Sequence, residues 1–188
     1  ESLDIPEQMK AIIHGTSNIV DNFLSVEFMW LYGLFLAEGS TYIDDQFACA
    51  KWSLHKQEIS DVAPILDSIG LNYNVSYSKS DLSASINVNS RPLVKWINSN
   101  TPKYAHNKEV PKWVFGLSTE LREAVLDGIC YGDGHLRPSG RHEVVTTSMP
   151  LALDIKMLAL SLGFVSSINL HKEAGTYLIE RRTGPTRK

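Results

Sequence analysis

The chain has 188 residues, of which 43% are hydrophobic and 21% charged, with a formal net charge of −3 at pH 7. This composition excludes a disordered chain, and no apolar run approaches the roughly 20 residues that a membrane-spanning helix needs. Two cysteines, Cys49 and Cys130, do not make a secreted disulfide scaffold, and no signal peptide is recognised. We therefore expect an intracellular globular protein. Because the chain begins at Glu1 rather than Met, we expect it to be a processed or excised segment of a longer precursor.

The charge is distributed unevenly along the chain. Residues 1–30 hold five acidic side chains against one lysine, so this segment carries −4 and the remaining chain about +1. A negative net charge argues against nucleic-acid binding, since phosphate neutralisation usually requires a basic excess. Most of the acid lies upstream of the first motif described below, and residues 171–188 form a basic end. Nucleic acid is therefore not excluded as a partner.

An internal repeat organises the sequence. Residues 31–39 (LYGLFLAEG) align with residues 126–134 (LDGICYGDG) at an offset of 95. The helix-like run 59–69, which ends at Gly70, matches the run 151–162, which ends at Gly163, with an offset of 93 between the two glycines. Such a repeat predicts two copies of one structural unit. We expect a first lobe over residues 1–110, with an N-terminal extension and an inter-lobe linker, and a second lobe over residues 111–188. We expect the second lobe to be incomplete at its C-terminal end, because the offset carries the partner of Lys108 past the last residue.

Hydrophobic periodicity predicts the order helix, hairpin, helix and strand pair in each half. In the first half these are a helix over 26–38, a hairpin over 41–55, a helix over 59–69, strands over 72–78 and 82–89, and a further helix over 91–98. In the second half they are a helix over 119–133, a hairpin over 135–147, a helix over 151–162, and strands over 165–172 and 177–181. The fold class is α+β, a pseudo-symmetric tandem αββαββ(α) repeat.

Two predicted strands alternate strictly between apolar and polar residues. In residues 82–89 one face carries the apolar residues Leu82, Ala84, Ile86 and Val88, while the other carries Ser and Asn; residues 71–78 alternate likewise. This pattern predicts a half-buried antiparallel sheet. Ser and Asn side chains both donate and accept hydrogen bonds, which suits the reading of base edges, although an ordinary solvated face is the simpler interpretation of either strand alone.

The two repeated motifs predict a pair of closely packed helices. Each carries two small residues four positions apart, namely Gly33 with Ala37 and Gly128 with Gly132. Glycine inside a helix costs about 1 kcal/mol relative to alanine, so its presence in both copies indicates a packing requirement. If the helices pack with these small residues facing each other, Glu38 and Asp133 come together at the helix ends. The pair of helices then lies at the lobe interface.

Two neighbouring carboxylates at helix C-termini require a nearby cation. Magnesium prefers oxygen ligands and leaves room for a substrate phosphate, so the pair predicts metal-dependent phosphodiester hydrolysis. The alternative is that both motifs are packing helices that end in a solvated turn. Acid is the disfavoured charge at a helix C-terminus, and its occurrence twice, each time before glycine, favours the functional interpretation.

These motifs resemble the two LAGLIDADG (dodecapeptide) motifs of single-chain homing endonucleases, particularly those embedded in inteins. Lys108-Glu109-Val110-Pro111 is similar to the Lys-x-x-Pro element of that family, and residues 148–164 resemble its later helix block. The resemblance covers nearly the whole chain. It implies a monomer with an internal pseudo-two-fold axis, whose two antiparallel sheets, each of four strands, form a saddle over double-stranded DNA.

The resemblance also implies roles for individual residues. Glu38 and Asp133 would bind Mg²⁺ (or Mn²⁺), with the carbonyl groups of Ala37 and Gly132 as additional ligands. Lys108 would position the attacking water or stabilise charge at the phosphate. Both DNA strands would be cut at a long, specific site to leave short 3′ overhangs. When bound to DNA, the protein would be associated with the nucleoid.

Candidate DNA contacts lie on the predicted strands and turns. They are Lys51, Ser53, His55, Asn74, Ser83, Ser85, Asn87, Arg141, Asn169, His171 and Arg181. The six histidines lack the spacing of a zinc site, and those on strands or turns are interpreted as polar-face residues.

Three features depart from the family pattern. Glu38 stands where aspartate is commoner, no second lysine matches Lys108, and neither end of the chain resembles an intein splicing junction. Unequal cleavage of the two strands is therefore expected, and splicing is not predicted. Two alternatives stay open: a catalytically weak or nicking remnant, and a non-catalytic DNA- or RNA-binding protein such as a regulator or a maturase.

Overall fold

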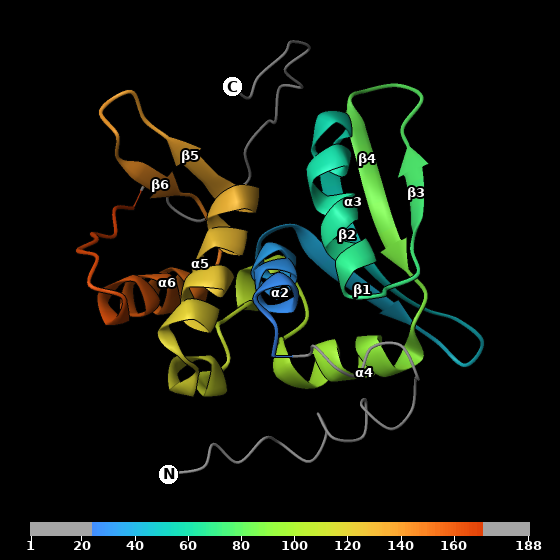
Figure 1. Ribbon diagram of the computed structural model, residues 1–188, viewed down its shortest axis with the longest axis horizontal. Helices are drawn as coiled ribbons and strands as arrows, with labels where there is room; N and C mark the ends of the chain where they lie inside the picture. Colours follow the sequence, from blue (N-terminus) through green and yellow to red (C-terminus); the bar gives the residue numbers. More distant parts are fainter. Residues whose placement is uncertain (1–23, 171–188) are drawn as a thin grey trace.

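The computed structural model describes residues 24–170 of the protein. Two helices, α2 (Val26–Glu38) and α5 (Thr119–Asp133), pack against each other near the centre of the molecule (Figure 1). The side chains of Ser25 and Ser118 begin these helices, because each hydroxyl oxygen accepts a hydrogen bond from a backbone N–H in the first turn. The bounds predicted for both motif helices are confirmed.

Glycines set the distance between the two helices. A Cβ atom on Gly33 would lie 2.1 Å from the carbonyl oxygen of Val125, and one on Gly128 would lie 2.0 Å from that of Trp30. Both contacts are with backbone atoms, which no side-chain rearrangement relieves. The predicted requirement for small residues between the motif helices is therefore confirmed.

The first half forms a four-stranded antiparallel sheet in the order β1-β2-β4-β3. Its strands are β1 (Gly39–Ile43), β2 (Ala48–His55), β3 (Asn74–Tyr77) and β4 (Ser83–Val88). The short 3₁₀ helix η1 (Lys56–Glu58) leads from β2 into α3 (Ile59–Ser68), which lies over one face of the sheet, and α4 (Arg91–Asn100) follows β4 (Figure 1). These elements agree with the predicted order.

The predicted alternation holds for the middle of the sheet and fails at its ends. Ala84, Ile86 and Val88 are buried as expected. Leu82, expected on the buried face, is instead exposed because it lies in the turn before β4 begins. Tyr77 is exposed as well, since β3 is an edge strand and ends at that residue.

The described part of the second half is smaller than predicted. It contains a hairpin of β5 (Gly134–Leu136) and β6 (His142–Val144), followed by α6 (Met149–Ser161). The prediction of a strand over 165–172 is wrong for residues 165–170, which have no regular structure; their apolar side chains, such as that of Val165 at 95%, are exposed. The second sheet therefore has two described strands rather than four. Residues 171–172 and the predicted strand at 177–181 lie outside the described residues.

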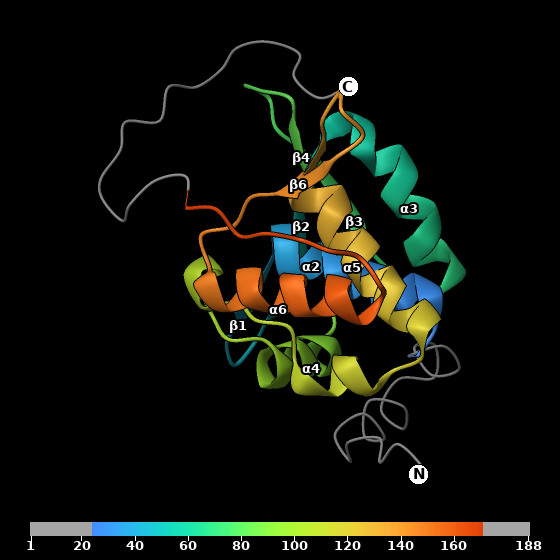
Figure 2. The same ribbon diagram turned by 90° about the vertical axis from the view of Figure 1, so that its left-hand side faces the viewer.

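The linker between the halves contains two short 3₁₀ helices, η2 (Ala105–Asn107) and η3 (Lys112–Gly116). Figure 2 shows α6 crossing the outer side of α5 at an angle, with the linker passing below. Among residues 24–170, no helix combines the length and apolarity required to cross a bilayer.

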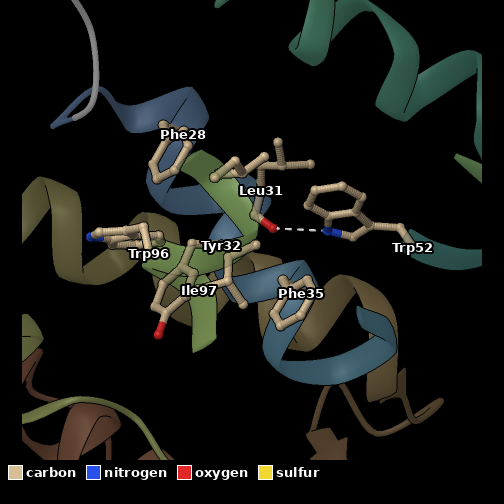
Figure 3. Close-up of a pocket in the computed structure, with 8 residues that line it drawn as sticks. Phe28, Leu31, Tyr32, Phe35, Trp52, Trp96 and Ile97 are labelled. Carbon is tan, nitrogen blue, oxygen red and sulfur yellow. Dashed lines mark hydrogen bonds between the residues drawn. The ribbon is translucent and has the colours of Figure 1, made fainter. Parts of the chain in front are cut away.

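Aromatic side chains fill the core between α2, α4 and the sheet (Figure 3). The indole N–H of Trp52 donates to the carbonyl oxygen of Leu31 at 3.2 Å, and the hydroxyl groups of Tyr32 and Thr101 share a hydrogen bond of 2.9 Å. The cavity among these side chains measures about 10 Å³. Such a space holds at most one water molecule, so it is a gap in the core packing and not a ligand pocket.

Candidate active site

The two acidic side chains singled out in the sequence lie at adjacent helix ends. Glu38 is the last residue of α2 and Asp133 the last of α5, and both are half-buried. A Cβ atom on Gly132 would lie 2.6 Å from Cβ of Ala37 and 3.1 Å from Cγ of Glu38. This close approach brings the C-terminal turns together, as the motif spacing predicts.

The glycine after each acid is required by the local backbone. Gly39 and Gly134 end their helices in an extended conformation and start β1 and β5 directly. A Cβ atom on Gly39 would lie 2.1 Å from the ring of Phe35, and one on Gly134 would lie 1.9 Å from the carbonyl oxygen of Cys130. The acid-glycine pair therefore marks the point where a buried helix turns immediately into a strand.

Lys108 reaches the end of α2 from the linker. Its side chain is 7% exposed, and Nζ donates to the carbonyl oxygens of Phe35, Ala37 and Gly39 at 2.9, 3.4 and 2.8 Å. Nζ also lies 5.2 Å from the centre of the Phe35 ring. The ammonium group thus neutralises the negative end of the helix at the residue next to Glu38.

Opposing effects act on the protonation of this lysine. Burial lowers the pKa of Lys108 to about 8, while the carboxylates of Asp133 and Glu38 act to raise it. Three carbonyl acceptors match the three N–H donors of an ammonium group, whereas a neutral amine has only two. We therefore take the lysine as charged below pH 8. Its interaction with both carboxylates places all three groups in one site.

The donor set fits a hard divalent cation. Carboxylates at two helix ends, together with backbone carbonyl groups of the last turns, are the oxygen ligands that Mg²⁺ and Mn²⁺ prefer. The carbonyl oxygen of Ala37 also accepts a hydrogen bond from Nζ of Lys108. Within residues 24–170, no cluster of three or more His, Cys, Asp or Glu side chains forms a self-sufficient metal site. A cation held here would need water or a substrate phosphate to complete its coordination.

The predicted contacts on the first sheet lie on a single face. In the strand register Lys51 is opposite Asn87, Ser53 is opposite Ser85, His55 is opposite Ser83, and Asn87 is opposite Asn74. On β2 and β4 these residues alternate with buried apolar residues that face the core, and on the edge strand β3 Asn74 precedes the half-buried Val75. We call this surface the polar sheet face.

Hydrogen bonds order part of the polar sheet face. Nδ2 of Asn87 lies 3.2 Å from Oγ of Ser85 and 3.3 Å from Oγ of Ser76, which bridges three neighbouring side chains. Ser85 is itself buried, so it supports its neighbours rather than offering a free hydroxyl group. The register adds Ser40 and Ser76 to this face. Alternation along the strands could have identified Ser76, whereas Ser40 depends on the pairing of β1 with β2.

The remaining predicted DNA contacts lie outside the first sheet. Arg141 is exposed in the turn between β5 and β6, and its carbonyl oxygen accepts from the backbone N–H of Arg137. Asn169 is exposed in the irregular stretch after α6. His171 and Arg181 lie outside the described residues.

Comparison with known proteins gives a fold and partial relatives. No protein-family model matches the chain. A DNA polymerase of Thermococcus kodakarensis is 36% identical over 75 residues, which are 40% of this chain and 4% of the polymerase. The ATP-dependent DNA helicase Hel308 of the same organism is 30% identical over 83 residues, which are 41% of this chain and 7% of the helicase. The chain therefore spans only a few per cent of the length of these relatives.

Solved structures of I-DmoI match most of the chain. The complex of I-DmoI with DNA and Mn has a TM-score of 0.59 at 14% identity, covering 79% of this chain and 84% of that chain. The complex with DNA and Ca has a TM-score of 0.60 at 13% identity, covering 81% and 79%. The chain adopts the fold of a single-chain LAGLIDADG homing endonuclease. The predicted α+β class, with motif helices between antiparallel sheets, is confirmed.

Proposed function

We propose that the chain, which has the fold of the homing endonuclease I-DmoI, is a site-specific endonuclease that hydrolyses phosphodiester bonds of double-stranded DNA with a divalent cation. The observation that carries this proposal is the approach of Glu38 and Asp133 at the paired helix ends, with the Lys108 ammonium group interacting with both. Two acids and a buried lysine at one surface site are more than packing requires, because acids at helix C-termini are destabilising.

The chain's own residues would act on the phosphate by charge and position. Glu38 and Asp133 would hold Mg²⁺ or Mn²⁺, with the carbonyl groups of Ala37 and Gly132 as further ligands; such a cation supplies Lewis-acid activation of the phosphate and of the attacking water. Lys108 is too enclosed by carbonyl groups to move freely onto the phosphate. It would instead fix the end of α2 and offset the charge of the acids.

Double-stranded DNA is the substrate that fits the polar sheet face. This face combines Lys51 for phosphate contacts with Asn and Ser side chains for base edges. The I-DmoI structures of the same fold are complexes with DNA. Because both acids come from one chain, we propose a monomer that cuts both strands, unequally, to leave short 3′ overhangs.

The pattern of relatives supports an origin as an embedded element. A polymerase and a helicase, proteins with different activities, each match a comparable stretch of this chain over 4% and 7% of their lengths. A homing element inserted into unrelated host genes would produce this pattern. We therefore propose that the chain serves intein-type homing and does not share the polymerase or helicase activity.

The test of the proposed function is cleavage of a randomised double-stranded target library with Mg²⁺, followed by sequencing of the ends. We expect recovered ends to share one site, and Asp133→Asn or Glu38→Gln to abolish cutting. The matched controls are Asp127→Asn and Glu27→Gln, exposed acids on the same helices, which should cut normally. Binding without cutting would favour the non-catalytic alternative, and accumulation of nicked product would favour the weak or nicking remnant.

A further inference from the structure

The backbone that directly follows the Lys108 side chain is held by α6. The hydroxyl group of Ser148, which is 1% exposed, donates to the carbonyl oxygen of Lys108 at 2.6 Å. The backbone N–H of Val110 donates to the Asp154 carboxylate at 2.9 Å. Both side chains come from the first turns of α6, so one helix end fixes residues 108–110 at two points.

These contacts connect the two halves of the molecule through the lysine. Ser148 and Asp154 belong to the second half, whereas Nζ of Lys108 contacts the last turn of α2 in the first half. A lysine side chain has four rotatable bonds and loses substantial entropy when it is held in one conformation. The position of Nζ against three carbonyl groups therefore depends on a fixed backbone at Lys108.

Ser148 does more than begin its helix. As the N-cap of α6 it accepts a hydrogen bond from the backbone N–H of Leu151 at 3.2 Å, and this acceptor role alone would suffice for capping. The additional donation to Lys108 uses the hydroxyl hydrogen on a residue 40 positions away. The carboxylate of the half-buried Asp154 likewise accepts a hydrogen bond from a backbone amide of the linker.

We propose that Ser148 and Asp154 are positioning residues that hold Lys108 against the end of α2 and so set the position of Glu38. This inference rests on the proposed function for its effect on cleavage. The described residues show a different arrangement at Asp133, whose carbonyl oxygen accepts from the backbone N–H of Val145 at 3.3 Å. Lys108 interacts with both carboxylates through its charge, but the hydrogen bonds of Nζ run to carbonyl groups on either side of Glu38. Displacement of Lys108 therefore moves Glu38 more than Asp133, and loss of the pair affects one DNA strand more than the other.

The experiment compares Ser148→Ala and Asp154→Ala with conservative variants. Ser148→Thr keeps both hydrogen bonds, and Asp154→Asn keeps an acceptor oxygen for Val110. Ser161→Ala, at the opposite end of α6, is the matched control, because within residues 24–170 its hydroxyl group donates to the carbonyl oxygen of Leu158 in the same helix and does not contact the linker. Cleavage is followed on a duplex with the two strands labelled separately, and DNA affinity is measured with Ca²⁺.

The expected result is a strand-selective loss. A misplacement of about 1 Å costs up to roughly a hundredfold in rate, so we expect the alanine variants to cut one strand at least about tenfold more slowly with little change of DNA affinity. The Thr and Asn variants and the Ser161 control should cut both strands at the unchanged ratio. Equal loss on both strands, or no loss in either alanine variant, would overturn the proposal.

A second measurement does not depend on cleavage. In protein labelled with ¹⁵N-lysine, a buried and hydrogen-bonded ammonium group exchanges slowly with water and gives a side-chain resonance, which Lys108→Met assigns by its loss. We expect this resonance to disappear in Ser148→Ala and to persist in Ser148→Thr. If the unsubstituted protein cuts no DNA but shows this pattern, the proposed function fails and the positioning role stands. If the resonance is unaffected in Ser148→Ala, the positioning role fails regardless of activity.

Discussion

Nζ of Lys108 lies 2.8 Å from the carbonyl oxygen of Gly39, the residue that follows the acid Glu38. A helix that ends in an acid and continues directly into a strand has concentrated negative charge and unsatisfied carbonyl groups. The buried ammonium group of Lys108 supplies positive charge and donates hydrogen bonds to these carbonyl groups. The same cation interacts with Asp133, so the end of α2 and the end of α5 share a source of positive charge.

Replacement of Lys108 should damage cleavage more than DNA binding. We expect Lys108→Met to lower kcat at least about a hundredfold, because several hydrogen bonds to a charged group are lost at about 1.5–3 kcal/mol each. Lys108→Arg should not restore activity, since a planar guanidinium group does not match three carbonyl acceptors around a point charge. Single-turnover cleavage and binding with Ca²⁺ separate the two effects. Lys112→Met, an exposed lysine four residues on, is the control; equal losses in both variants would contradict the prediction.

The lowered pKa of Lys108 predicts a dependence of stability on pH. The folded pKa of about 8 lies below the unfolded value of 10.5, so the unfolded chain retains the proton more strongly between these values. Stability should therefore rise with pH above 8, by at most about 1.4 kcal/mol per pH unit, and be independent of this group below 8. Burial raises the pKa of the Tyr32 and Tyr131 hydroxyl groups, which removes stability above the unfolded tyrosine pKa of 10. Burial likewise raises the pKa of the Cys49 and Cys130 thiols, which removes stability above the unfolded cysteine pKa of 9. The effect of Lys108 is therefore cleanest between pH 8 and 9, and above 9 it is seen only as a difference from a variant without the lysine.

Urea unfolding over this pH range tests this linkage. The free energy of unfolding of the unsubstituted protein should rise relative to that of Lys108→Met as the pH increases from 8 towards 10. The difference between the two curves isolates Lys108, because all other titrating groups are common to both proteins. Parallel curves would show that the lysine keeps its ordinary pKa in the fold.

The close packing of the motif helices predicts a large effect of one added methyl group. Gly128→Ala places Cβ against the carbonyl oxygen of Trp30, so we expect a loss of about 3 kcal/mol in unfolding free energy. Alanine is the better helix former, and propensity alone would therefore increase stability by about 1 kcal/mol. Glu123→Ala on the exposed side of α5 is the control and should change stability little. A stabilised Gly128→Ala protein would mean that the helices are not held at this distance.

Much of the fold was predictable because local patterns and the repeat agree. The bounds of α2 and α5 follow from capping serines and from the acid-glycine ends, which the structure explains by backbone contacts at Gly39 and Gly134. The prediction of a strand over residues 165–170 failed for a physical reason. Val165 and its neighbours have apolar alternation, but a strand also requires a partner, and sequence periodicity contains no information about pairing.

The residues of the candidate site could be predicted from the sequence, but their geometry could not. The family resemblance identified Lys108, but only the structure shows that Nζ is enclosed by three carbonyl groups of α2. The contacts of Ser148 and Asp154 could not be predicted from the sequence, because an N-cap serine and a helical aspartate are ordinary surface patterns. Their contacts with Lys108 and Val110 span about forty positions, which local patterns do not encode.

The polar sheet face predicts a measurable salt dependence of DNA binding. Lys51 is exposed at the centre of this face, opposite Ser40 and Asn87. If Lys51 contacts a phosphate, Lys51→Ala should weaken binding to all sequences alike and reduce the slope of log K against log salt by about 1, because one fewer counterion is released. Fluorescence anisotropy with Ca²⁺ over a salt series measures this slope. Lys95→Ala, an exposed lysine on α4 and away from this face, should leave it unchanged. A Lys51→Ala protein with an unchanged slope would remove the polar sheet face from the DNA interface, while a change of sequence preference would move Lys51 from phosphate to base contact.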